Sequence, residues 1–192
     1  MHAFDTAEST INHAHALIEK GWHAVGLYLS PSRTTREQVE GLHSVGIRIF
    51  SIWEKGKPTS KSYFSPEKGT ADGKAAAAYA EVLGMPAGKP VFACFDYDTS
   101  MADINSVCKE YQVAFRAAVM AKGYLVGCYG SGLLCQTYVS AGISHYGWLA
   151  QSTGFAGFSD YKPNATIVQG PSTNIMGLDS DVDYINDESV LW

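Results

Sequence analysis

Short apolar segments recur along this chain, and stretches with helical periodicity separate them. Eight such segments can be distinguished: Ala3–Asp5, Ala24–Leu29, Ile47–Trp53, Val91–Tyr97, Tyr124–Tyr129, Tyr146–Ala150, Ala165–Gln169 and Val182–Tyr184. Gly21, Gly46 and Gly123 each precede one of these segments, and a glycine in the left-handed conformation commonly ends a helix. Segments that are apolar throughout and alternate with helices are typical of parallel strands covered on both faces.

Eight strands favour an α/β fold of the TIM type, a compact closed (β/α)8 barrel, although 192 residues is short for that fold. The clearest helical pattern covers residues 104–120. We expect reduced helices in the last units, because residues 154–164 have the composition of a loop and residues 171–180 leave room for little helix. An open doubly wound sheet is the competing architecture. No linker divides the chain, so residues 1–192 are expected to form a single domain.

Composition argues against several classes of partner. The net charge of −5 disfavours nucleic acid, because phosphate binding needs clustered Lys and Arg. No stretch approaches the ~18 apolar residues of a membrane span. The N-terminal residues lack the basic and hydrophobic regions of a signal peptide, so we expect release or delivery by another route unless a signal has been removed. The cysteines lack C-x-x-C spacing and are expected to be buried free thiols: Cys94, Cys108, Cys128 and Cys135.

Five carboxylates lie where apolar segments end: Asp5, Glu54, Asp96, Asp98 and Asp183. The carboxyl ends of barrel strands meet at one face, so we expect these acids to converge on one mouth. Side chains alternate along a strand, which would put Asp96 and Asp98 on the inner face with Phe92 and Cys94. In the third strand, Trp53 would face the helices or the rim. Because the acids are spread over several strands and no compact set of oxygen ligands is apparent, no metal or other cofactor is implied.

Tyrosines and amides occupy equivalent positions at the ends of other segments: Tyr28, Tyr129, Gln151 and Gln169. Their rings can stack on a sugar, and their polar groups can bind its hydroxyls, so they are candidate substrate-binding residues. Two nearby carboxylates cannot both ionise freely, and one keeps its proton near neutral pH. A protonated acid beside an ionised one can cleave a glycosidic bond. Helix capping by Asp5 or Asp98 is the alternative for a single acid, but it accounts poorly for all five.

Several motifs, taken in order, resemble the glycoside-hydrolase-like domains that were once classed as a domain of unknown function. The motifs are Phe4-Asp5-Thr6, Val25-Gly-Leu-Tyr-Leu29, Phe95-Asp-Tyr-Asp98, Gly127-Cys-Tyr-Gly130, Trp148-Leu-Ala-Gln151, Ile167-Val-Gln169 and Val182-Asp183. Those domains are similar to the family 25 lysozymes, which are modified (β/α) barrels that cleave the glycan of peptidoglycan. The resemblance covers nearly the whole chain and implies the same fold and substrate class.

The resemblance also implies roles for individual residues. Asp5 matches the first-strand acid and Asp183 the last-strand acid, while Asp96 and Asp98 match the Asp-x-Glu pair whose Glu donates the proton. Asp98 replaces that Glu here, which retracts the acid by roughly 1.5 Å, and misplacement on that scale can cost about 100-fold in rate. The general acid is therefore either Asp98 or Glu54. Asp96 would stabilise the developing cation or orient the N-acetyl group of the substrate.

The resulting hypothesis is a monomeric, lysozyme-like (muramidase-like) hydrolase that acts on peptidoglycan or a related polysaccharide at the bacterial cell wall. A phage endolysin or a delivered antimicrobial effector would fit. One alternative is a barrel that binds wall polysaccharide without cleaving it. A more distant one is a magnesium-dependent phosphatase, because residues 95–99 also match the Asp-x-Asp-x-Thr signature of haloacid-dehalogenase-type enzymes, and Asp183 with its preceding acids could bind the metal.

Overall fold

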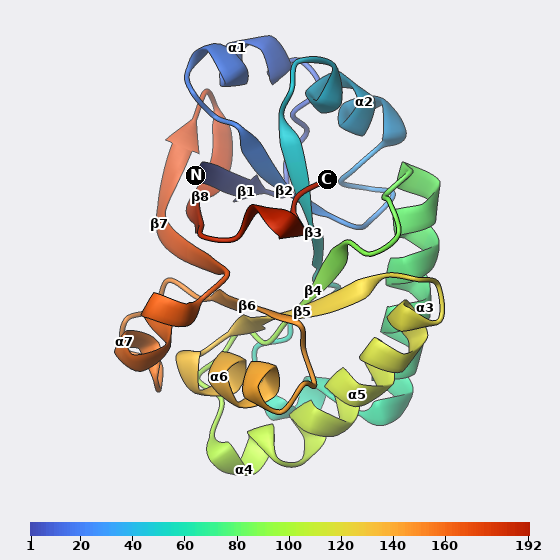
Figure 1. Cartoon of the computed structure of the whole chain (residues 1–192), viewed down its shortest axis with the longest axis vertical. Helices are drawn as coiled ribbons and strands as arrows, with labels where there is room; N and C mark the ends of the chain where they lie inside the picture. Colours follow the sequence, from blue (N-terminus) through green and yellow to red (C-terminus); the bar gives the residue numbers. More distant parts are fainter.

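A computed structural model describes residues 1–192, and its eight strands form a closed barrel (Figure 1). The strands are β1 (His2–Thr6), β2 (Ala24–Tyr28), β3 (Arg48–Trp53), β4 (Pro90–Cys94), β5 (Leu125–Gly130), β6 (Tyr146–Leu149), β7 (Ile167–Ile175) and β8 (Leu178–Ile185). Each strand pairs with its successor in the chain, and β8 closes the barrel against β1. The predicted barrel is confirmed, and the open doubly wound sheet is wrong.

From α5 onward the helices become progressively shorter. They are α1 (Ala14–Glu19), α2 (Arg36–Ser44), α3 (Pro66–Leu83), α4 (Met101–Ile104), α5 (Val107–Met120), α6 (Gly132–Ser140) and α7 (Phe158–Tyr161). The helical pattern of residues 104–120 corresponds to α5 preceded by the short α4. No helix lies between β7 and β8, so the prediction of reduced last units is confirmed. None of these helices has the combination of length and apolar character needed to cross a bilayer.

Helices α3 and α5 lie side by side along the barrel (Figure 1). Gly69 and Gly73 of α3 permit this approach, since a Cβ atom on Gly69 would lie 2.3 Å from the carbonyl oxygen of Tyr111. Ser65 begins α3 by accepting a hydrogen bond from the backbone of Lys68. The two glycines thus allow α3 to pack closely against α5, and Ser65 fixes where α3 begins.

The last two strands correct the expectation of a wholly parallel sheet. β7 and β8 form an antiparallel hairpin that turns at Met176 and Gly177, and β8 is also antiparallel to β1. Residues 171–180 are thus mostly strand. The carboxyl end of β8 consequently lies at the opposite end of the barrel from those of β1–β7, which changes where the acids of β8 are found.

Alternating side chains divide the core into an inner and an outer cluster. The inner cluster fills the barrel and includes Phe92 and Cys94, as predicted. The outer cluster packs against the helices and includes Trp53, also as predicted. The C-terminal segment crosses the barrel near the start of β3 (Figure 1), where Trp192 exchanges backbone hydrogen bonds of 2.7 and 2.9 Å with Ile49. All four cysteines are buried and free, as predicted.

Candidate active site

A cavity of about 190 Å³ lies at the carboxyl ends of the parallel strands, inside the mouth of the barrel. Most of the predicted site residues line it, together with residues that the sequence analysis did not select. The lining residues are Tyr28, Glu54, Cys94, Asp96, Tyr129, Trp148, Gln151, Gln169 and Asp181. A second cavity of about 200 Å³ shares Tyr28 and Asp181 with the first and is lined also by Asp5. Together they form an acidic mouth whose floor is the inner core.

Asp5 is nearly buried at the end of β1 and is held by two donors. The hydroxyl of Tyr28 donates to Asp5 Oδ1 over 3.0 Å, and the amide nitrogen of Gln169 donates to Asp5 Oδ2 over 3.2 Å. The same amide nitrogen donates to Asp181 Oδ2 over 3.1 Å, and Tyr129 donates to the amide oxygen of Gln169 over 2.8 Å. Burial, followed by the negative charge of Asp181, raises the pKa of Asp5 to about 7.

Asp183 does not lie at the mouth, which corrects its predicted position. In the antiparallel pairing of β8 with β1, Asp183 faces Ala3, and Asp181 faces Asp5. Asp183 is fully buried one layer deeper, where Trp148 Nε1 donates to its Oδ1 over 2.9 Å and its Oδ2 has no partner. Burial, with the charge of Asp5 second, raises the pKa of Asp183 well above its ordinary value. This environment favours a protonated carboxyl group.

Asp181 is the residue of β8 that sequence reasoning missed. It stands two positions before Asp183 and so points to the same inner face. A parallel last strand would put the later residue, Asp183, at the mouth. In an antiparallel strand the earlier residue, Asp181, lies there. The available signal was the alternation Asp179, Asp181, Asp183, because acids two positions apart point to the same face of β8 whichever direction the strand runs.

Asp98 also departs from its predicted position. β4 ends at Cys94, so the alternation of a strand does not extend to residues 95–98. Asp98 is exposed, lines neither mouth cavity, and accepts a 2.8 Å hydrogen bond from the backbone N–H of Ala156. The carboxylate of Asp98 therefore binds the loop that precedes α7. The two acids of the Asp-x-Asp-x-Thr segment therefore diverge, and only Asp96 faces the mouth.

Glu54 and Asp96 lie at the ends of the neighbouring strands β3 and β4 and line the same cavity. Their loops are joined by a 2.9 Å hydrogen bond from the backbone N–H of Asp96 to the carbonyl of Pro58. Burial, followed by the charge of Asp96, raises the pKa of Glu54, and the positive charge of Arg33 opposes that rise. Partial burial and the charge of Asp181 raise the pKa of Asp96. These two acids therefore share a site in which one proton is favoured.

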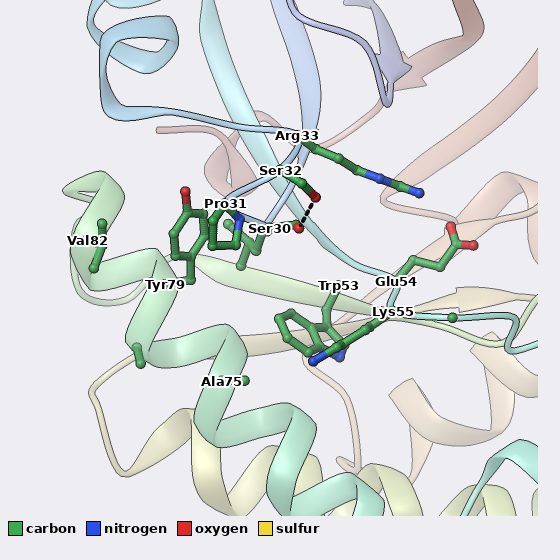
Figure 2. Close-up of a pocket in the computed structure, with 13 residues that line it drawn as sticks. Ser30, Pro31, Ser32, Arg33, Trp53, Glu54, Lys55, Ala75, Tyr79 and Val82 are labelled. Atoms are coloured by element: carbon green, nitrogen blue, oxygen red, sulfur yellow. Dashed lines mark hydrogen bonds between the residues drawn. The ribbon is translucent and has the colours of Figure 1, made fainter.

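Arg33 is a further residue near the mouth that sequence reasoning did not select. Its guanidinium group lies 4.7 Å from the centre of the Tyr28 ring. Figure 2 shows this group and the carboxylate of Glu54 extending from their two loops toward the same side. The described residues form no group of three or more His, Cys, Asp or Glu side chains placed to hold a metal ion. The carboxyl groups of the mouth can transfer protons and stabilise positive charge.

A closed barrel whose mouth gathers carboxyl groups, tyrosines and amides belongs to the class of glycoside-hydrolase-like barrels. Within that class, this chain belongs to the family described as the Rv2525c-like, glycoside hydrolase-like domain, whose model matches residues 15–185. The family expected from the sequence motifs is therefore confirmed.

Relatives with similar sequences or structures extend this comparison. The chain is 29% identical over 208 residues to the uncharacterized protein YbfG of Bacillus subtilis, covering 93% of this chain but only 28% of YbfG. It resembles the Tat-secreted protein Rv2525c of Mycobacterium tuberculosis, solved with HEPES, with a TM-score of 0.80, 18% identity and coverage of 97% and 95% of the two chains. The autolysin LytC of Streptococcus pneumoniae, solved with a synthetic peptidoglycan ligand, has a TM-score of 0.57, 13% identity and coverage of 95% and 47%. These structures share the fold.

Proposed function

We propose that this protein is a lysozyme-like (muramidase-like) hydrolase that cleaves the glycan strand of peptidoglycan. The observation that carries the proposal is the pair Glu54 and Asp96, two carboxyl groups in one cavity whose pKa values are both raised. A protonated acid beside an ionised carboxylate is the equipment for glycosidic cleavage. The family membership and the fold shared with an autolysin support the choice of substrate.

In this mechanism Glu54 is the general acid. It protonates the leaving glycosidic oxygen, and the carboxylate of Asp96 stabilises the positive charge that develops on the sugar ring or orients the N-acetyl group for attack. Glu54 is preferred over Asp98 because Asp98 is bonded to Ala156 outside the mouth cavities. Asp5 and Asp181, held by Gln169, form a second acidic pair that borders the reacting sugar.

The remaining polar residues of the mouth bind substrate in this proposal. Tyr28, Tyr129, Gln151 and Gln169 would contact the faces and hydroxyls of sugars next to the cleaved bond. The enzyme would work as a monomer at the bacterial cell wall after release or delivery, as an endolysin or an antimicrobial effector does.

The test measures wall clearing and new reducing ends with purified peptidoglycan. Glu54→Gln should lower kcat by about 100-fold to 10,000-fold, the usual contribution of a general acid. Asp98→Asn is the matched control, because it neutralises an acid that follows the neighbouring strand β4 but lies outside the mouth cavity, and it should keep activity within a few fold. If Glu54→Gln clears the wall as well as the unaltered protein, Glu54 is not the acid and the mechanism is wrong.

A barrel that binds wall glycan without cleaving it is the second candidate. The observation that favours it is that Asp98, the residue at the position of the lysozyme proton donor, is bonded outside the cavity. Sedimentation of the protein with purified peptidoglycan, run beside the reducing-end assay, separates the two. Binding without new reducing ends supports the non-catalytic candidate.

A further inference from the structure

A groove of about 510 Å³ lies outside the barrel, between α3 and the loops that follow β2 and β3 (Figure 2). We propose that this groove binds the peptide stem of peptidoglycan by receiving one of its carboxylates. The identity of this ligand rests on the proposed function.

The groove adjoins the mouth of the barrel, because Glu54 lines both the groove and the mouth cavity. In the proposed mechanism Glu54 contacts the glycosidic oxygen at the cleaved bond. A substituent that branches from the neighbouring sugar on that side would therefore extend into the groove. In peptidoglycan that substituent is the peptide attached to the lactyl group.

The base of the groove holds a hydrogen-bond donor without a partner. Trp53 is 6% exposed and lines the groove, and its indole Nε1 is buried and makes no hydrogen bond. A buried donor left unpaired is costly, and native structures seldom retain one without a reason. Strand alternation turns Trp53 outward from the barrel, so its N–H group cannot serve the mouth. An acceptor brought by a ligand would satisfy it.

Two cations lie at the same groove. Lys55 and Arg33 line it, and in the view of Figure 2 the Lys55 side chain crosses the indole of Trp53, which lines the same groove. Their charges contrast with the net charge of −5 for the whole chain. Lys55 is exposed on a flexible stem, so its ammonium group can rotate away from Trp53 and meet the same ligand oxygen. A carboxylate would accept from the indole N–H and pair with the ammonium.

The opposite wall is apolar and suits the aliphatic part of a short peptide. Pro31 and Val82 are exposed there, and Val82 is 57% exposed. The ring of Tyr79 is fixed because its hydroxyl donates to the carbonyl of Thr34 over 2.6 Å. The sugars of the wall glycan are uncharged once the lactyl group carries its peptide, whereas the stem has free carboxylates. The combination of cations, an unpaired donor and an apolar wall therefore favours the peptide over a sugar.

The first test titrates the synthetic stem peptide L-alanyl-γ-D-glutamyl-L-lysine into the full chain by calorimetry. Trp53→Phe removes the N–H group and keeps an aromatic ring, and Lys55→Met removes the charge and keeps the length. Each should weaken binding about tenfold, which corresponds to about 1.4 kcal/mol. Lys20→Met, a lysine outside the groove, should change nothing, and the peptide with its carboxylates amidated should bind like the variants.

The proposal is overturned if the peptide does not bind, or if both variants bind it as well as the unaltered protein. Circular dichroism verifies that Trp53→Phe folds. If Trp53→Phe does not fold, the test rests on Lys55→Met, which changes an exposed side chain.

A second test separates this proposal from the proposed function. Cleavage of intact wall glycan is compared with cleavage of glycan stripped of peptides by an amidase. The rate of cleavage by Trp53→Phe should fall about tenfold on intact glycan and little on stripped glycan. An equal fall on both substrates would overturn the role of the groove. If neither glycan is cleaved, but the peptide binds and both variants weaken peptide binding, then the proposed hydrolase activity is wrong and the proposed peptide site in the groove is supported.

Discussion

Asp5 and Asp181 lie directly opposite each other on the antiparallel strands β1 and β8, and one amide nitrogen, that of Gln169, bonds to both carboxyl groups. The three residues come from the two ends of the chain and meet because the barrel closes there. This contact brings a buried acid and a half-buried acid close together, with an amide N–H group between them. The hydrogen bond from Gln169 lowers the pKa of Asp5, so that pKa depends in part on a residue that carries no charge.

Replacing the bridging amide should raise the pKa of Asp5 further. Gln169→Leu removes a hydrogen bond that lowers this pKa and leaves the hydroxyl of Tyr129 without its acceptor. The expected loss in the free energy of unfolding is about 1–3 kcal/mol, the usual cost of unpaired buried polar groups. Carboxyl titration by NMR measures the pKa of Asp5, and denaturant unfolding measures the loss of stability. Gln151→Leu, at an exposed amide of the same mouth, should alter both much less.

Stability should fall as the pH rises from about 4 to about 7. Asp5 has a pKa of 3.8 when unperturbed and about 7 in the folded chain, and Asp183 is shifted in the same direction. The folded state thus keeps protons that the unfolded state releases, so the stabilisation is full below about pH 4 and is lost through about pH 7. Urea unfolding at several pH values measures it.

Asp183→Asn provides the matched variant for this pH effect. An amide at this position can still accept from Trp148 and has no proton to lose. The variant should show a weaker dependence on pH and should exceed the unaltered protein in stability near pH 8. A decline with pH as steep as in the unaltered protein would show that Asp183 does not contribute.

Removing the cation beside Glu54 should shift the alkaline limb of the activity profile. The charge of Arg33 lowers the pKa of Glu54, so Arg33→Met should raise that pKa and keep the general acid protonated to a higher pH. The profile of kcat against pH with purified peptidoglycan measures the shift. Arg36→Met serves as control because Arg36 pairs with Glu40 on the surface of α2. A shift toward lower pH would contradict the role assigned to Glu54.

Asp98→Ala should loosen one loop and leave the chemistry intact. The carboxylate of Asp98 accepts from the backbone of Ala156, so its removal should speed hydrogen exchange at that amide and cost about 1 kcal/mol of stability. Activity should stay within a few fold. Hydrogen exchange followed by NMR measures the exchange rate at the Ala156 amide, and denaturant unfolding measures the loss of stability. An unchanged exchange rate would mean that the bond does not hold the loop.

The position of Glu54 could be predicted because it directly follows a parallel strand whose apolar pattern is strong. Asp96 also lines the mouth cavity, although β4 ends two residues before it. Trp53 could also be placed, since alternation within one strand needs no knowledge of its partners. Asp98 could not, because strand β4 ends at Cys94 and the next residues follow a loop. Arg33 was missed because loop residues carry no period that predicts a direction.

The sequence alone determined the number of strands and the inner and outer faces of most strands, because these depend on local apolar periodicity, and the count of eight strands favoured a closed barrel. Only the tertiary structure decided that β8 runs antiparallel, that Asp181 instead of Asp183 lies at the mouth, and that Gln169 joins it to Asp5. The physical reason is that barrel closure joins β1 to β8, which lie at opposite ends of the chain, so spacing within one segment does not decide which side chains meet. The direction of β8 follows from the two-residue turn between Ile175 and Leu178, which makes it antiparallel to β7.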